Sequence, residues 1–166
     1  MDNVQYRMAT LEDLESVWDK DIKRNQGEEI WVRWKKEYID YNKNNDAKTF
    51  VAANGDDIIA QITVVLTDKV KAVYGKTFLC DNQTVNMNAF RCDKEFEGQG
   101  HISKLVKMGE EYARSLGKKY ATIGAEATIP RNLSIYFHFG YTEFLKALEE
   151  DDNGEKELVL YYRKKL

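Results

Sequence analysis

Two glycines stand directly before the clearest helix pattern in this sequence. Gly98 and Gly100 follow a strand-like run and precede apolar residues at helical spacing from Ile102 onward. The first turn of a helix leaves backbone N–H groups without partners, and the helix dipole adds partial positive charge there. A phosphate satisfies both, and glycine lets its oxygens approach the backbone closely. The pattern therefore favours a phosphate or pyrophosphate site, although a glycine pair before a helix is often only a tight turn.

The known nucleotide motifs do not fit this turn. A dinucleotide fingerprint needs a third glycine where Ser103 stands, and neither glycine of this turn is followed by the lysine that a P-loop requires. Cys92 could act as a nucleophile, but no histidine stands at a readable spacing, and buried cysteines are usually inert. His101 and His138 lack acidic partners, so we expect no metal site.

Hydrophobic periodicity predicts the elements that must position the glycine turn. Strands are expected over residues 4–8, 49–53, 58–66, 85–92, 120–128, 142–148 and 157–163, with weaker strand patterns over 70–74 and 77–80. Helices are expected from the N-cap Thr10 to about Arg24, over 29–42, from Ile102 to Gly117, and over 132–139. Turns are expected at residues 54–57 and in an acidic segment, 149–155. No linker interrupts the 166 residues, which suits one domain over residues 1–166.

Two blocks of the sequence resemble the GNAT superfamily of N-acetyltransferases. The first block runs from Phe90-Arg91-Cys92 through Gly98-Gln99-Gly100 into the following helix and resembles the acetyl-CoA signature of that family. In the second block, Asn132 precedes a helical Tyr136 and an aromatic residue follows Gly140. The resemblance is strong over about residues 85–144, and elsewhere only the order of elements agrees.

The resemblance implies an α/β (α+β) fold with a mixed, mostly antiparallel central sheet, splayed middle strands and flanking helices. It implies acetyl-CoA as cosubstrate, with no metal. The backbone of residues 90–92 would pair with the pantetheine arm, amides of residues 97–103 would hold the pyrophosphate, and Asn132 would contact the cofactor. The implied cofactor-binding residues are Phe90, Arg91, Cys92, Glu97, Gly98, Gln99, Gly100, His101, Ile102, Ser103 and Asn132.

Three residues depart from the family pattern. Glu95 stands where arginine or glutamine is usual, and Glu97 adds a second negative charge near the expected phosphates. Each repulsion should be of order 1 kcal/mol at an exposed position, because water and salt screen it. Ile102 replaces a small residue and would crowd the cofactor. These departures bear on cofactor affinity more than on the fold.

The implied reaction is direct attack of an amine on a thioester. Tyr136 would protonate the departing thiolate of coenzyme A, or would simply be a packed aromatic residue. A lysine-like amine is mostly protonated at neutral pH, so some group must accept a proton. Glu126 and Asp93 are candidates for this role, and the alternative for both is an ordinary surface charge.

Composition narrows the partners and the compartment. The formal net charge of −3 disfavours nucleic acid, and no apolar leader or membrane span is visible. Two cysteines are too few for a secreted disulfide scaffold, so a cytoplasmic setting is expected. The expected partner is a small-molecule or protein amine, and the family resemblance makes a homodimer possible.

Three functions remain open at this point. The leading one is an acetyl-CoA-dependent N-acetyltransferase acting on a primary amine. The second is a non-catalytic acyl-CoA-binding module of the same fold, and the third is an interaction domain using the aromatic helix face of Trp31, Trp34 and Tyr38. That face would be either a wall for a cationic amine or plain core. Acceptor specificity is expected from the second helix, the loop after it and residues 66–74.

Overall fold

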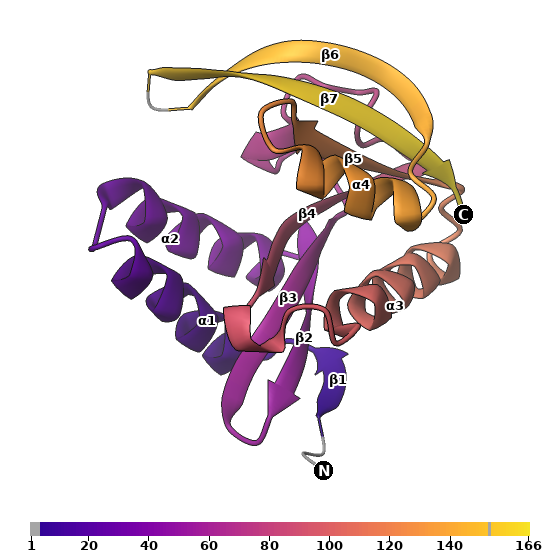
Figure 1. The fold of residues 1–166 in the computed structure, drawn as a ribbon. Helices are drawn as coiled ribbons and strands as arrows, with labels where there is room; N and C mark the ends of the chain where they lie inside the picture. Colours follow the sequence, from indigo (N-terminus) through magenta and orange to yellow (C-terminus); the bar gives the residue numbers. More distant parts are fainter. Residues whose placement is uncertain (1–3, 153) are drawn as a thin grey trace.

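The computed structural model describes residues 4–152 and 154–166, which contain seven strands and four α-helices (Figure 1). This description does not include residues 1–3, at the start of the segment expected to lack a leader. It also does not include residue 153, at the tip of the expected acidic turn. In chain order, the elements are β1 (Gln5–Met8), α1 (Leu11–Arg24), α2 (Glu29–Lys43), β2 (Ala47–Asn54), β3 (Asp57–Val65), η1 (Lys71–Val73), β4 (Thr84–Cys92), η2 (Lys94–Phe96), α3 (His101–Ser115), β5 (Tyr120–Glu126), α4 (Pro130–His138), β6 (Glu143–Asp152) and β7 (Glu155–Lys165).

The described strands form one sheet in the order β1-β2-β3-β4-β5-β7-β6. Neighbouring strands are antiparallel except for β4 and β5, which run parallel in the middle of the sheet. The mixed, mostly antiparallel sheet flanked by helices is therefore confirmed. The parallel pair is reached through α3, which crosses over one face of the sheet between β4 and β5, as a parallel connection requires.

The parallel pair β4 and β5 separates soon after it begins. Only three residue pairs are in register, Thr84↔Tyr120, Val85↔Ala121 and Asn86↔Thr122. Both strands then continue, β4 to Cys92 and β5 to Glu126, and Figure 1 shows β5 leaving with β6 and β7 while β4 stays with β3. The expected splay of the middle strands is present.

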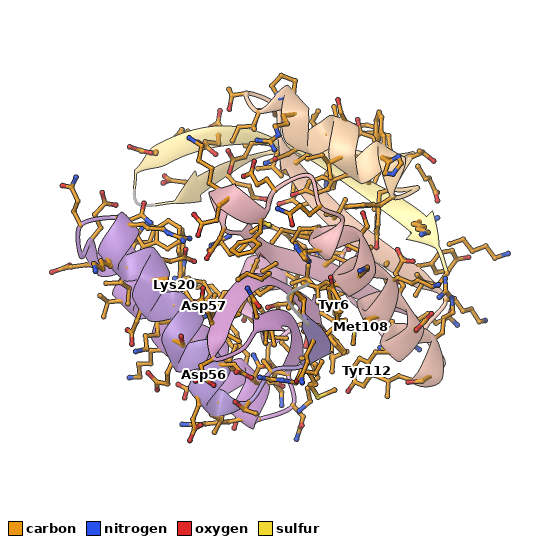
Figure 2. All side chains as sticks on the ribbon, turned by 60° about the horizontal axis from the view of Figure 1, so that its bottom comes forward. Tyr6, Lys20, Asp56, Asp57, Met108 and Tyr112 are labelled. Carbon is orange, nitrogen blue, oxygen red and sulfur yellow. The ribbon has the colours of Figure 1, made fainter. Side chains whose placement is uncertain are left out.

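The helices cover both faces of the β1–β4 half of the sheet. On one face, Leu14 and Trp18 of α1 and Tyr38 of α2 pack on Val51 and Ile58 in one buried cluster. On the opposite face, α3 buries its apolar side in the larger cluster of the protein. Figure 2 shows Tyr6 of β1 beside Met108 and Tyr112 of α3, and all three pack against that larger cluster.

The first helix begins where its capping signal predicts. The Thr10 side chain accepts a hydrogen bond from the amide of Asp13 (3.2 Å), and the Asp13 carboxylate accepts one from the amide of Thr10 (2.7 Å). Asp13 also pairs with Arg7 of β1. This reciprocal cap therefore ties the start of α1 to the edge strand.

The weak strand patterns over residues 70–74 and 77–80 are wrong. The segment instead forms η1 and successive turns, because its amides bond to carbonyls three residues back, as from Val73 to Val70 and from Lys76 to Val73. Val70 and Val73 are fully buried, and Leu79 is almost fully buried. These apolar residues therefore anchor a folded loop and do not belong to a strand.

Two boundaries near the C-terminus also differ from the predictions. Pro130 opens α4 rather than ending a strand, because the first helical position needs no backbone N–H. The expected acidic turn is mostly strand, since Glu149 to Asp152 pair with β7 in a long hairpin. Cross-strand hydrogen bonding has overridden the low strand propensity of acidic residues.

Replacing Thr10 by alanine should lower the free energy of unfolding by about 1 kcal/mol, because the Asp13 amide loses its acceptor. Urea denaturation measures this change through the transition midpoint. Thr77→Ala is the matched control, since Thr77 is exposed and should shift stability by less than about 0.5 kcal/mol. Equal effects of the two substitutions would contradict the capping role.

Candidate functional site

The turn before α3 presents a row of backbone donors. Gly98 and Gly100 have left-handed φ angles of 75° and 83°, and a Cβ added at either would meet nothing within 4 Å. Helical bonding begins with the Lys104 amide, which donates to the Gly100 carbonyl (3.1 Å). The amides of residues 98 to 103 have no acceptor within the described chain. These N–H groups stand at an open helix start, where an anion is stabilised.

Glu97 lies at the edge of this row rather than within it. Its amide donates to the Lys94 carbonyl (3.3 Å), and its carboxylate pairs with Arg131 of α4 (2.7 Å). The negative charge that departs from the family pattern is therefore neutralised by a neighbouring cation. The backbone carbonyl of Glu95 accepts a hydrogen bond from the Gln99 side chain (3.0 Å), which braces the same turn.

His101 and Ile102 face the protein interior. The His101 ring is buried, and its Nδ1 lies 2.8 Å from the Tyr6 hydroxyl, which accepts a hydrogen bond from Lys104 (3.2 Å). Burial lowers the pKa of His101, and the Lys104 charge lowers it further. Ile102 packs against the larger core cluster. Both side chains anchor the helix start, so only their amides face the open turn.

The end of β4 turns main-chain groups toward the gap between β4 and β5. The Asp93 amide donates to the Ile59 carbonyl of β3 (2.8 Å). Because successive residues of a strand point their N–H and C=O groups to opposite sides, residues 90 and 92 direct theirs away from β3. The β3–β4 register shifts nearby, where Ala89 has a φ of 50°. The Ala89 amide donates to the Asn88 side chain (2.6 Å), which stabilises this bulge.

Arg91 joins this strand end to α1. Its Nε donates to the buried Asp21 (2.8 Å), and its guanidinium lies 5.5 Å and 5.2 Å from the ring centres of Trp18 and Trp31. Its Nη1 donates to the Phe90 carbonyl (2.9 Å). Arg91 therefore orients the Phe90 peptide group.

Asp93 is also committed to α1. It is buried and forms ion pairs with Lys20 (3.0 Å) and Arg24 (2.8 Å). Lys20 additionally pairs with Asp57, the first residue of β3, and Figure 2 shows the two residues close together. With two cations bound to it, this carboxylate serves the contact between α1 and the sheet.

Tyr136 of α4 lies across the gap from β4. Its ring packs against Phe90, with ring centres 5.4 Å apart. Burial raises the pKa of Tyr136 to about 12, the Glu126 charge adds to the rise, and Arg91 opposes it. The hydroxyl therefore carries its proton at neutral pH and can donate it.

Glu126 stands at the end of β5. Burial is the main cause that raises its pKa, and the charge of Glu157 and a hydrogen bond with it raise it further. A carboxyl group with a raised pKa accepts a proton more readily than an ordinary surface carboxylate.

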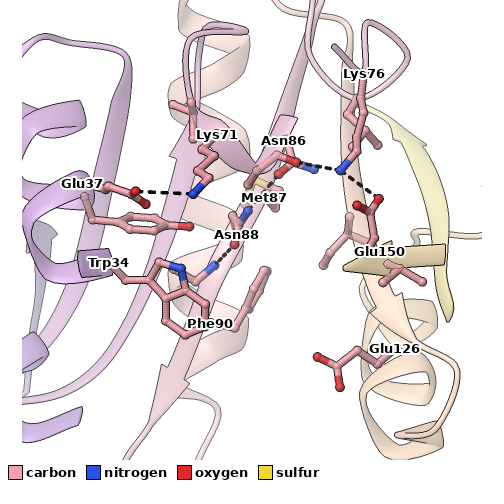
Figure 3. Close-up of a pocket in the computed structure, with 18 of the residues that line it drawn as sticks. Trp34, Glu37, Lys71, Lys76, Asn86, Met87, Asn88, Phe90, Glu126 and Glu150 are labelled. Atoms are coloured by element: carbon pink, nitrogen blue, oxygen red, sulfur yellow. Dashed lines mark hydrogen bonds and ion pairs between the residues drawn. The ribbon is translucent and has the colours of Figure 1, made fainter. Parts of the chain in front are cut away.

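These residues surround one cavity of about 480 Å³ that opens where β4 and β5 part (Figure 3). Phe90, Arg91, Glu126, Asn132 and Tyr136 all line it. The glycine turn does not line this cavity. The site therefore has two parts, a cradle of unpaired backbone amides at the start of α3 and a mixed polar and aromatic cavity beside Tyr136.

The comparisons with known proteins agree with this arrangement. The family described as Acetyltransferase (GNAT) family matches residues 11–141. The chain belongs to the GNAT acetyltransferase family. It is accordingly an acetyltransferase enzyme.

Solved structures of GNAT acetyltransferases share the fold at low sequence identity. An N-acetyltransferase from Staphylococcus aureus Mu50 superposes with a TM-score of 0.74 at 15% identity, with 98% of each chain covered. A spermidine N-acetyltransferase variant from Vibrio cholerae gives 0.68 at 13% identity, covering 98% of this chain and 93% of the other. A ribosomal-protein-alanine N-acetyltransferase from Brucella melitensis gives 0.71 at 16%, covering 98% and 99%. Among proteins with curated descriptions, none matched.

Several residues of this GNAT cavity were not anticipated from the sequence. Asn86 and Asn88 point polar side chains from β4, while Lys76, Glu150 and Tyr161 come from the folded loop and the β6–β7 hairpin. Two asparagines at a spacing of two in an apolar strand were a readable signal of a polar strand face. Lys76, Glu150 and Tyr161 gave no such signal in the sequence, because only long-range packing brings them together.

Two further properties of the acetyltransferase concern metals and membranes. Across residues 4–152 and 154–166, no group of three or more His, Cys, Asp or Glu side chains could hold a metal ion. In the same part of the chain, no helix has the length and apolar character needed to cross a membrane.

The two thiols should be poor nucleophiles. Burial raises the pKa of Cys80 to about 11, and burial and then the charges of Glu97 and Asp93 raise that of Cys92. Because the thiolate is the reactive form, iodoacetamide should label Cys92 more slowly than free cysteine at pH 7.5, with a rate that rises past pH 9. Mass spectrometry of the labelled protein measures this rate. Labelling as fast as free cysteine would restore a nucleophilic role for Cys92.

Proposed function

We propose that this protein is an acetyl-CoA-dependent N-acetyltransferase that transfers the acetyl group by direct attack of a primary amine. The proposal treats residues 1–166 as one cytoplasmic acetyltransferase domain. The observation that carries it is the row of unpaired amides at residues 98–103, together with a cavity that Tyr136 lines. Two free cysteines are consistent with a reducing compartment. The homodimer stays a prediction.

The residues present suit coenzyme A. The amides of residues 98–103 would hold the pyrophosphate, and two glycines leave space for its oxygens. The backbone of Phe90 and Cys92, directed away from β3, would pair with the pantetheine arm. Glu97 contributes less than the sequence suggests, because its amide is already bonded and Arg131 neutralises its carboxylate. Asn132 would contact the cofactor from α4, within the same cavity as Tyr136.

Acetyl-CoA supplies a thioester whose carbonyl accepts the amine and whose thiolate departs. Tyr136 would donate its proton to that thiolate, since its hydroxyl carries a proton at neutral pH. Glu126 would take up the proton released by the amine, and its raised pKa supports this role. The amide of Cys92 would stabilise the oxyanion that develops on the carbonyl.

The acceptor would be an amine of a small molecule or protein. Solved neighbours are named for spermidine and for the alanine of a ribosomal protein, both of which are amines. In this chain, Trp34 and Tyr38 of α2 line the cavity, so part of the aromatic helix face is available to a cationic group. Trp31 instead packs on Trp18 and Arg91.

Tyr136→Phe should lower kcat by about 10²- to 10⁴-fold and leave KM for acetyl-CoA unchanged, because the ring packing stays and the proton is lost. A thiol-release assay with acetyl-CoA and an amine panel measures both. Tyr74→Phe is the control, since Tyr74 is 75% exposed. Unchanged turnover in Tyr136→Phe would remove the proton-donor role, and acetyl-CoA binding without any turnover would instead favour a non-catalytic acyl-CoA-binding module.

The pH profile of kcat should carry an acidic limb from Glu126. Its carboxylate must be deprotonated to accept a proton, so kcat falls as pH drops through a pKa that lies above the ordinary value of 4.5. Glu126→Gln should lower kcat and abolish this limb. Glu111→Gln, at an exposed position of α3, should leave the limb in place. A limb that persists in Glu126→Gln would assign proton acceptance to another group.

A further inference from the structure

An ion pair between two protein side chains lies at the end of the cavity away from Phe90 and Glu126 (Figure 3). Lys76, from the loop before β4, reaches Glu150 of β6, with Nζ 2.8 Å from Oε1 (Figure 3). The side chains are only 21% and 30% exposed. Lys76 also donates to the Ala72 carbonyl (3.3 Å), and the buried Tyr161 donates its hydroxyl to Glu150 (2.7 Å). An additional hydrogen bond at each residue therefore holds the Lys76–Glu150 pair in position.

A second cation stands near the same end. Lys71 Nζ lies 3.9 Å from Glu37 Oε1, on the wall formed by α2. In Figure 3, Lys71 and Lys76 occupy one end of the cavity and Phe90 and Glu126 the other. Within the described chain, Glu126 has no cation within 4 Å, whereas Glu37 and Glu150 both do. Among the described residues that line the cavity, the carboxylates without a cation within 4 Å are Glu126, which lies near Tyr136, and the exposed Asp151.

This charge pattern distinguishes between amines. One ammonium group of the substrate can lie against Glu126, and this ammonium group then loses its proton. A second ammonium at the far end would meet Lys76 and Lys71, and like charges repel most strongly where protein excludes water. Glu150 cannot offset this repulsion while Lys76 occupies it.

We infer that the acceptor is a small primary amine with a single positive charge, and that Lys76 excludes diamines and polyamines by occupying Glu150. The inference rests on the proposed acetyl transfer and makes Lys76 a residue that determines specificity. A purely structural Lys76, which only ties the loop to the hairpin, would affect all amines alike.

The test compares 1-aminobutane with 1,4-diaminobutane as acceptors for acetyl-CoA. Wild-type protein should have the higher kcat/KM for the monoamine. Lys76→Gln should shift the ratio of the two kcat/KM values toward the diamine by about tenfold or more, because the freed Glu150 can accept a charged hydrogen bond. Lys76→Arg should keep the wild-type ratio, as should Lys107→Gln, at an exposed position of α3.

The double variant Lys76→Gln/Glu150→Gln identifies the group that receives the second ammonium. It should lose the gain for the diamine that Lys76→Gln shows alone. A wild-type preference for the diamine, an equal change for both amines in Lys76→Gln, or a gain that survives in the double variant would overturn the inference.

Failure of the proposed function is distinguishable from failure of this inference. If the wild type acetylates neither amine, acetyl transfer to small amines fails, and calorimetry of the two amines binding to wild type and Lys76→Gln then decides the inference. Tighter binding of the monoamine to wild type, with the preference shifted toward the diamine in Lys76→Gln, would support it. The same preference in both proteins would overturn it.

Discussion

The separation of β4 from β5 after three residue pairs is the constraint on which the rest of this structure depends. At the last of these pairs, the Asn86 side chain donates hydrogen bonds to Thr122 (3.1 Å to its hydroxyl and 3.4 Å to its carbonyl) and so joins the two strands where they begin to separate. Beyond it, strand groups that a continuous sheet would pair with each other face an open gap instead. The cavity opens at this break in the ladder, and Ala89 of the bulge and Tyr136 of α4 both line it.

Charge compensation allows the two halves of the site to coexist in an acidic chain. Glu97 beside the amide cradle is paired with Arg131, and Asp93 behind β4 is paired with Lys20 and Arg24. These two carboxylates therefore have counterions, while Glu126 has none within the described chain. Its raised pKa follows from burial and from Glu157. Glu126 thus differs from Glu97 and Asp93, because it has a raised pKa and no ion-pair partner within the described chain.

Local signals in the sequence were sufficient for most of the fold. The cap at Thr10, the glycine turn and the amphipathic pattern of α3 each reflect physics within a few residues, and the two family blocks placed β4, α3 and α4 in order. The loop from Val70 to Cys80 was misassigned because its apolar spacing suits a strand and a folded turn equally. The β6–β7 hairpin was predicted too short because acidic residues disfavour strands locally. The contact between Lys76 and Glu150 could not be predicted, since the two residues are 74 positions apart and only the tertiary fold brings them together.

A cradle made of main-chain amides has a consequence for sequence drift. Every residue type except proline supplies an N–H, so most side-chain changes at positions such as Gln99 or Ser103 leave the donors intact. Within this row, Gly98 and Gly100 are the positions whose left-handed φ angles favour glycine. Mutational tolerance of this kind is consistent with the 11% to 16% identity between this chain and solved structures of the same fold. It also leaves acceptor preference, which depends on side chains from the loop and the hairpin, free to diverge on its own.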